Sequence, residues 1–241
     1  MKMTTLLLTA LFFSVNHGLM ENQEEKKLIV KEIEYDGKAT LDDVSRLLEE
    51  QTELHAIGVL NWDAFSYAPE VRFRIAYSNN DIWLKYYVSE ENILAQHTAI
   101  NSGVAGDSCV EFFFDPLADG NYYNFEFSCI GTPHLSYGPG RQNREFVDPN
   151  IIDEYLKIKS TLGDQPFDEK KGGHKWEMTI VIPAELFTNN KGINIAGIAS
   201  KANFFKCGDD TSKKHYLTWN PVGTPRPDYH RPEYFGTVVF E

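Results

Sequence analysis

The chain has 241 residues, 42% of them hydrophobic and 24% charged, which suits one well-cored globular domain of the larger β type. It contains 16 Phe and 12 Tyr against 4 Met, and because aromatic side chains fit a pleated surface, this composition argues against a helical bundle. The formal net charge of -12 offers little to a phosphate backbone, which argues against nucleic acid as a partner.

The N-terminal residues 1–20 have the pattern of a secretory signal. Lys2 gives a basic start, the apolar run 6–15 follows, and polar residues end the run. The run is too short for a helix that spans a membrane, so we expect export to the periplasm, the cell surface or the medium. The alternative is a buried N-terminal strand. We expect residues 21–27 to form a flexible charged segment and residues 28–241 to form a single domain.

From residue 28 onward, short alternating segments predict many strands and few helices. Thr40 supplies an N-cap signal for one helix. Loops are expected at residues 89–106 and 136–144 and in the Pro-rich segment 221–232. This order predicts an all-β fold, an antiparallel β-sandwich that is jelly-roll-like, with one or two short helices. The expected strands are 28–35, 53–62, 71–77, 82–88, 176–182, 193–205, 216–219 and 236–241, and the expected helical segments are 41–50, the start of 151–161, and 183–187.

The strongest pattern in the chain is a β-hairpin over residues 106–131, in which apolar and polar side chains alternate on both arms. Alternation buries one face of a hairpin in a core and leaves the other face available. We therefore expect a site on the polar face. The buried face is expected to hold Val110, Phe112, Phe114, Phe125, Phe127 and Cys129, and the polar face Glu111, Asn124, Glu126 and Ser128.

Three cysteines, an odd number in a protein expected to be exported, leave at least one thiol unpaired. In the expected register, Cys109 and Cys129 point to opposite faces of the hairpin and cannot form a disulfide, although a slip of one residue would reverse this. We interpret Cys109, Cys129 and Cys207 as small buried hydrophobic residues. The sequence contains no Cys-x-x-Cys motif and no Cys/His cluster with zinc spacing.

Six motifs follow one another along the chain: DSCVEFFFD (107–115), YYNFEFS (122–128), WEMTIVIP (176–183), ANFFKCGDD (202–210), LTWNP (217–221) and YFGTVVFE (234–241). In this order they resemble the family 9 carbohydrate-binding modules, particularly their stand-alone bacterial relatives. The resemblance covers residues 55–241, and it implies a β-sandwich that binds sugars without cleaving them, in a cleft where aromatic rings flank a terminal sugar.

The resemblance also assigns roles to particular residues. It implies that Glu111 bonds sugar hydroxyls and that Trp219 forms a stacking wall. A second stacking tryptophan of the family pattern falls on Ala105, so that wall is missing unless a neighbour such as Tyr137 supplies it. Some family members carry calcium, but no run of closely spaced oxygen ligands is visible here, and we expect no cofactor.

Sugar rings present apolar faces edged by hydroxyls, so a binding site needs an aromatic ring and planar hydrogen-bonding groups. Several candidates also have an ordinary structural explanation. Trp219 could be a core residue at a strand end, Glu111 could face solvent, and Arg141 could form a surface ion pair. The candidate binding residues are Trp219, Glu111, Asn124, Glu126, Tyr137, Arg141, Asn203 and Lys206, with Arg144 and His230 as weaker candidates.

Two other classes of function stay open at this point. A glycoside hydrolase could use Glu111 and Glu126, which the expected register makes diagonal neighbours about 7–8 Å apart. The other class is a haem-binding or partner-docking sandwich. Haem would need axial ligands, and no His or Met pair is marked out by its surroundings. We expect a non-catalytic monomer with a carbohydrate ligand, no nucleic acid partner and no membrane span.

Overall fold

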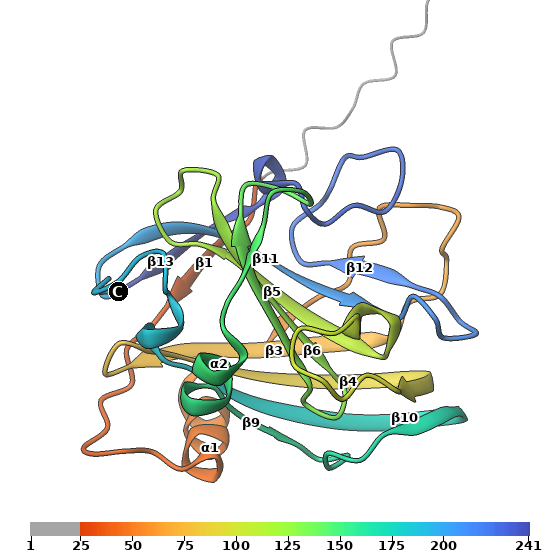
Figure 1. The fold of residues 1–241 in the computed structure, drawn as a ribbon, viewed down its shortest axis with the longest axis horizontal. Coiled ribbons are helices and arrows are strands. Elements are labelled where there is room, and N and C mark those ends of the chain that lie inside the picture. The colour runs from red at the N-terminus through yellow and green to blue at the C-terminus, as the bar shows by residue number, and fades with distance from the viewer. Residues whose placement is uncertain (1–24) are drawn as a thin grey trace, which may run out of the picture.

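Two β-sheets packed face to face form the framework of residues 25–241, the part of the chain that this computed structural model describes (Figure 1). Strands from both halves of the sequence enter each sheet, and all pairs except β1–β13 are antiparallel. The first sheet has the order β1 (Lys27–Val30), β13 (Gly236–Phe240), β11 (Ala199–Cys207), β5 (Cys109–Asp115), β6 (Tyr122–Ser128), β7 (Pro133–Gly138) and β8 (Glu145–Phe146), with β12 (Tyr216–Thr218) paired to β11.

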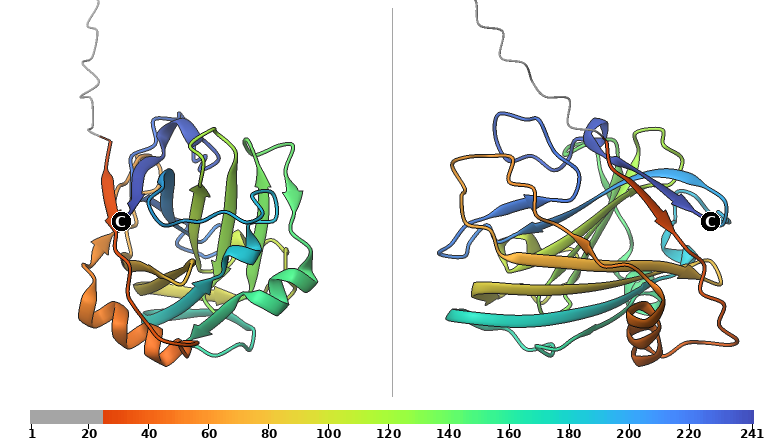
Figure 2. Two further views of the ribbon diagram at one scale, coloured as in Figure 1. Left: turned by 90° about the vertical axis from the view of Figure 1, so that its left-hand side faces the viewer. Right: turned by 180° about the vertical axis from the view of Figure 1, so that it is seen from behind.

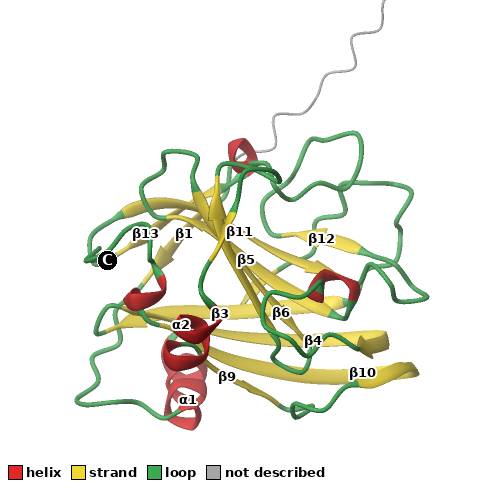
Figure 3. Cartoon of the chain, in the orientation of Figure 1, coloured by secondary structure: helices red, strands yellow, loops and turns green. Residues whose placement is uncertain are grey.

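The second sheet lies below the first in Figure 1 and carries the longest strands. Helices are few and short beside the strands (Figure 3), so the predicted all-β sandwich with one or two short helices is confirmed. The sheet has the order β2 (His55–Ala56), β3 (Glu70–Ser78), β4 (Asp81–Ala95), β10 (Phe167–Ile182) and β9 (Lys157–Ser160); the helices are α1 (Leu41–Gln51) and α2 (Pro149–Tyr155), and single 3₁₀ turns lie at Val104–Gly106, Ala184–Leu186 and Pro232–Tyr234.

Aromatic rings join the two sheets in the central core. Phe112 of β5 stacks on Phe204 of β11 with ring centroids 4.9 Å apart, and Phe204 stacks on Phe73 of the second sheet at 3.9 Å. All three side chains are fully buried. Burying one such ring stabilises a fold by roughly 1.5–3 kcal/mol. The apolar face that the hairpin pattern predicts is therefore the inner face of the first sheet.

Helix α1 covers part of the outer face of the second sheet. Its N-terminus is closed by a capping box, in which Asp43 N–H donates to Thr40 and the Asp43 carboxylate accepts from the Thr40 backbone. Val44 and Leu48 of the helix pack with Trp83 of β4. The predicted N-cap at Thr40 is confirmed, and no helix within residues 25–241 is long and apolar enough to cross a membrane.

Two strands are longer than the sequence pattern predicts. Strand β4 continues to Ala95, through residues expected to form a loop, and it pairs with the polar first half of β10. That half, residues 167–175, is mostly exposed on both sides, so it lacks the alternation that marks a half-buried strand. Part of the expected loop 136–144 is strand β7, which ends at Gly138.

The expected strand 53–62 contains only the two-residue β2 and an isolated bridge between Val59 and Thr218. The predicted signal at residues 1–20 lies outside the described residues. Of the segment 21–27, expected to be flexible, Lys27 begins β1 and the backbone N–H of Lys26 donates to Asn220 Oδ1 at 2.9 Å. These last residues belong to the folded sheet.

The outer face of the first sheet is covered in part by a second apolar cluster. Trp62 and Tyr229, from segments far apart in the chain, pack there over Phe113 and Phe205. Figure 2 shows the C-terminal segment, in blue, folded over the same side of the molecule as the first sheet. The face that alternation left available is thus partly closed, and what stays open is a cavity.

Candidate functional site

A cavity of about 450 Å³ lies over the middle of β5 and β6 on this outer face. Its size falls in the range of small-molecule sites. The sheet supplies the floor, and the loop before β8 and the segment before the last 3₁₀ turn supply the walls. The lining residues are Ala105, Glu111, Glu126, Arg141, Cys207, Asp209, Tyr216, Arg226, Pro227, Asp228, Tyr229 and His230.

Two glutamates meet on the floor of the cavity. Glu111 of β5 pairs directly with Glu126 of β6, because Phe112 pairs with Phe125 on the other face. The predicted polar face is confirmed, but the predicted diagonal arrangement is wrong by two residues, because the two glutamates are directly opposed. Directly opposed residues have Cβ atoms about 4.5–5.5 Å apart. The side chains are 3% and 8% exposed, so this is a desolvated pair of acids.

Burial raises the pKa of Glu111 well above its ordinary value, and the nearby Glu126 raises it further. The Cys207 thiol donates to Glu111 Oε1 at 3.1 Å. This hydrogen bond and the positive charge of Arg141 both lower the pKa of Glu111, but by less than burial raises it. A carboxyl group that keeps its proton can both donate and accept a hydrogen bond. The floor therefore offers both kinds of partner.

Asn124 lies beside this pair and orients it. Its Nδ2 donates to Glu126 Oε1 at 2.8 Å, and the side chain is 1% exposed. Its Oδ1 is buried and has no hydrogen-bond partner within residues 25–241. A buried acceptor left without a donor is costly, so a donor supplied from outside the chain would stabilise this part of the structure.

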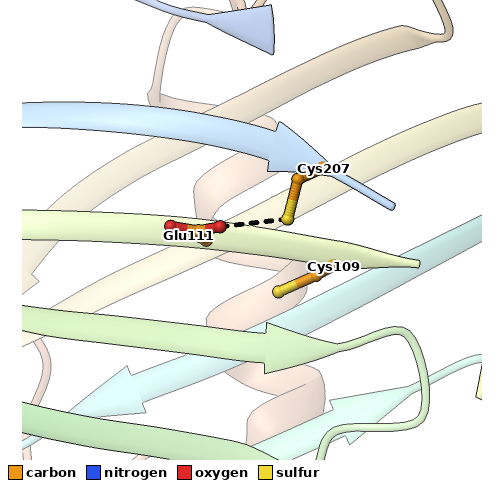
Figure 4. Close-up of side chains that lie close together, drawn as sticks. All are labelled: Cys109, Glu111 and Cys207. Atoms are coloured by element: carbon orange, nitrogen blue, oxygen red, sulfur yellow. Dashed lines mark hydrogen bonds between the residues drawn. The ribbon is translucent and has the colours of Figure 1, made fainter. Parts of the chain in front are cut away.

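Two cysteines border Glu111 on the floor (Figure 4). Cys109 of β5 pairs directly with Cys207 of β11, and burial raises the pKa of the Cys109 thiol to about 11. Cys129 lies on the inner face of the sheet, where its thiol donates to Leu94 O at 3.5 Å. The predictions that Cys109 and Cys129 face opposite ways and that all three thiols are buried and free are confirmed.

An ion pair closes one side of the cavity. Arg141, which is well exposed, donates to Asp228 at 2.9 Å. Behind it, the ring of His230 hydrogen-bonds with the Tyr122 hydroxyl at 2.8 Å. Burial lowers the pKa of His230 to about 3, helped by the charges of Arg141 and Arg144, so the ring is neutral. Arg141 is therefore an exposed charge of this wall that a single ion pair holds in place.

Arg144 has a structural task instead. Its guanidinium stacks over the Tyr122 ring at 4.3 Å and donates to Ser136 Oγ and to four backbone carbonyls, among them Tyr122 O and Gly138 O. These bonds occupy its donors and anchor the loop that presents Arg141.

Aromatic rings of the cavity come from residues that the sequence did not single out. Tyr229 stacks on Phe205 with centroids 4.1 Å apart, and Tyr216 meets Trp62 edge to face at 6.2 Å. Ala105 lines the cavity at the position where the family pattern has a stacking tryptophan. The small side chain leaves that wall open.

Trp219 does not line the cavity, so the expectation that it forms a stacking wall of the site is corrected. The ring is 4% exposed and packs edge to face on Phe204 at 5.6 Å. Lys26 lies over one side, and a Cβ on Gly236 would come within 2.5 Å of the ring. Trp219 is a core residue because the first strand and the last strand close over it, which local sequence does not reveal.

Asn203 and Tyr137 also lie away from the cavity. Asn203 is fully buried, and its Oδ1 accepts from Phe204 N–H and Asn220 N–H, each at 2.9 Å, while its Nδ2 donates to Asn220 O. It ties the C-terminal segment to β11. Tyr137 faces inward, where its ring packs against Tyr123 with centroids 4.6 Å apart.

Lys206 points into the interior of the sandwich. Its ammonium group lies 2.9 Å from Glu90 Oε2 and donates to His215 Nε2 and Cys207 O, both at 2.8 Å. Burial and the charge of Lys206 lower the pKa of His215 to about 3, so the neutral ring accepts this bond. These two hydrogen bonds and the Glu90 carboxylate surround the ammonium group. The residue links the two sheets, and it has no donor left for a ligand.

The structure thus brings together Glu111, Glu126 and Arg141 of the predicted set, with Asn124 adjoining them. His230, a weaker candidate, also lines the cavity, and the cavity residues that sequence reasoning missed come mainly from β12 and from the segments 207–209 and 226–229. Their signal was weak: a Pro-rich loop after a short strand. Nothing in that loop says over which face of which sheet it folds.

The fold and the site together define a β-sandwich with a polar, partly aromatic cavity on one sheet. The model of carbohydrate-binding family 9 matches residues 42–240 of the chain. The chain belongs to this family, and the resemblance of its six motifs is confirmed. No match was found among curated proteins.

Solved structures support the same assignment. A Bacteroides uniformis ATCC 8492 protein, described as a "putative carbohydrate-binding protein", is 36% identical, with a TM-score of 0.87 over 90% of this chain and 100% of that chain. A family 9 module of Caldicellulosiruptor kristjanssonii in complex with glucose is 14% identical, with a TM-score of 0.57 over 90% and 96% of the two chains. A structure of a family 9 module from the same organism with cellotriose is 15% identical, with a TM-score of 0.53 over 90% and 94%. The last two show the shared fold.

Trp219→Ala is expected to lower the free energy of unfolding by about 3–5 kcal/mol, because it opens a cavity in the core. Urea unfolding followed by circular dichroism measures the change. Leu54→Ala, which removes a side chain that is 40% exposed, is the control and should change stability by less than about 0.5 kcal/mol. A variant Trp219→Ala as stable as the wild type would contradict the core assignment.

The raised pKa of Glu111 predicts that the free energy of unfolding depends on pH. The folded state binds the proton of this group more tightly than the unfolded state, so its contribution to stability falls as pH rises above the ordinary value of 4.5. Glu111→Gln cannot ionise. In urea unfolding in chelator-containing buffer, the free energy of unfolding of the variant should rise relative to that of the wild type as pH is raised. The exposed Glu53→Gln is the control, and equal pH profiles for wild type and Glu111→Gln would refute the shift.

Proposed function

We propose that this protein is an exported, non-catalytic carbohydrate-binding protein, and that the sugar occupies the cavity over Glu111 and Glu126. The observation that carries the proposal is this buried acid pair, open to a cavity of about 450 Å³ in a member of a carbohydrate-binding family. The signal pattern of residues 1–20 supports export. We propose a monomer.

The polar groups in and beside the cavity suit sugar hydroxyls. Glu111 bonds only the weak Cys207 thiol donor, Asn124 Oδ1 lacks a donor within residues 25–241, and Arg141 can turn from Asp228 toward a ligand oxygen. Hydroxyls both donate and accept, so one sugar ring can satisfy groups of each kind. A neutral ligand also adds no charge to an acidic floor. The glucose and cellotriose bound by the Caldicellulosiruptor modules make a glucose-type sugar our first choice.

Stacking in this cavity falls to residues other than Trp219. Tyr216 and Tyr229 border the site, although one face of Tyr229 is covered by Phe205. A further ring stands outside the cavity on the same face of the sheet. Phe146 of β8 is 64% exposed, and among residues 25–241 it is the one large aromatic side chain with such exposure.

Sheet register places Phe146 beside the acid pair. Glu126 pairs with His134 on β7, and the His134 ring meets Phe146 at 5.3 Å. Strands β6 and β8 are two steps apart, which is about 10 Å. We therefore propose Phe146 as a stacking platform for a second or third sugar unit that extends from the cavity.

The first test is calorimetric titration with glucose and cello-oligosaccharides. Glu111→Ala should raise Kd by roughly tenfold to a hundredfold, since a hydrogen bond to such a group contributes about 1.5–3 kcal/mol. Glu53→Ala, at an exposed position outside the cavity, should bind like the wild type. Unchanged binding by a folded Glu111→Ala would refute the site. Release of sugar by the wild type, lost in Glu111→Gln, would favour a glycoside hydrolase instead.

Phe146→Ala should weaken the binding of oligosaccharides by roughly fivefold to tenfold and leave the binding of glucose unchanged. The reason is that one stacked ring contributes about 1 kcal/mol beyond area burial. The matched control is Leu117→Ala, an exposed apolar residue between β5 and β6 that does not line the cavity. Equal losses for glucose and oligosaccharide would place Phe146 inside the first subsite and contradict the platform.

A further inference from the structure

Three potential metal ligands converge at the floor of the cavity, two of them lining it and one lying behind it. The thiols of Cys109 and Cys207 and a carboxylate oxygen of Glu111 all lie within 4.8 Å of one another (Figure 4). Strand pairing produces the cluster, because Cys109 and Cys207 are direct partners in adjacent strands and Glu111 follows two residues after Cys109 on the same face. In sequence the two cysteines are almost a hundred residues apart, which is why no zinc spacing is visible.

The donor set selects the kind of ion. Calcium prefers six to eight oxygen ligands, so two sulfurs and one carboxylate do not fit the calcium that some relatives carry. Two thiolates and a carboxylate suit zinc, which takes sulfur, nitrogen and oxygen ligands in a tetrahedral shell. In such a shell, sulfur atoms bound at about 2.3 Å lie just under 4 Å apart. The observed cluster is compatible with this spacing.

The surroundings leave room for a cation. Glu111 is buried beside a second carboxylate, Glu126, and its one hydrogen-bond donor within residues 25–241 is the Cys207 thiol. Arg141, one of the two arginines that line the cavity, is paired with Asp228 instead. A divalent ion between Glu111 and the two sulfurs would offset the repulsion between the carboxylates.

We propose that Cys109, Glu111 and Cys207 form a zinc-binding site with an open fourth position. Glu111 and Cys207 line the cavity, whereas Cys109 lies behind them in the apolar cluster, so the open position faces the cavity. Water or a sugar hydroxyl would complete the shell. On binding, each thiol gives its proton to solvent and its sulfur lone pair to the ion, and Glu111 gives up any proton that it holds, so at least two protons are released per ion.

The site rests in part on the proposed function, because Glu111 would serve both the ion and the sugar. The two are separable, since Cys109 is a proposed metal ligand but does not line the cavity. Loss of metal binding with intact sugar binding would remove the zinc site alone. Metal binding without any sugar binding would remove the proposed function alone.

Cobalt(II) added to the full chain, reduced and freed of metal with a chelator, tests the proposal directly. Thiolate coordination should give a sulfur-to-cobalt charge-transfer band and tetrahedral d–d bands, and about one equivalent of zinc should abolish them. Cys109→Ser and Cys207→Ser should each weaken binding by more than about tenfold. Cys129→Ser is the matched control, because Cys129 is equally buried on the opposite face of the sheet.

Three results would overturn the site. The first is a wild type with three free thiols in denaturant that gives no charge-transfer band. The second is a band that survives in Cys109→Ser and Cys207→Ser but is lost in Cys129→Ser. The third is a single free thiol per denatured chain, which would show that Cys109 and Cys207 join in a disulfide. Circular dichroism of each variant separates loss of a ligand from loss of the fold.

Discussion

The pairing register of β5 and β6 is the constraint on which the rest of the structure depends. It sets Phe112 against Phe125 on the inner face and Glu111 against Glu126 on the outer face. The inner pair joins the aromatic stack that holds the sheets together. A slip of one residue would send the acids into the core and the rings to the surface, so the core that stabilises the sandwich also fixes the floor of the site.

Desolvation then gives that floor its chemistry. The second apolar cluster, built on Trp62 and Tyr229, closes over much of the outer face and keeps the acid pair away from bulk water. Two acids so placed repel one another, and the chain leaves them few partners of its own. A buried acid pair of this kind adds little to the stability of the packed protein. It suits contact with a polar ligand, a proton or a cation.

Buried charge is handled differently at the end of the sandwich. Lys206 and Glu90 form a fully buried ion pair, and Trp176 Nε1 donates to the other oxygen of Glu90 at 2.7 Å. Each charge there has a charged partner within the chain, whereas the one hydrogen-bond donor to the Glu111 side chain within residues 25–241 is a weak one, the Cys207 thiol. The Lys206–Glu90 pair therefore joins the two sheets, whereas Glu111 keeps capacity for a further hydrogen bond.

The sequence by itself determined the class of fold, the family, the capped helix after Thr40 and the face to which each hairpin side chain belongs, because period-two alternation and capping are local properties. Glu111 and Glu126 were identifiable as candidates on that ground. Only the tertiary structure decided that Trp219 and Lys206 are internal, that Cys109 meets Cys207, and that a distant loop walls the cavity. Those outcomes depend on which strands become neighbours and which segments close over them, and pairing between remote strands leaves no mark in a local pattern.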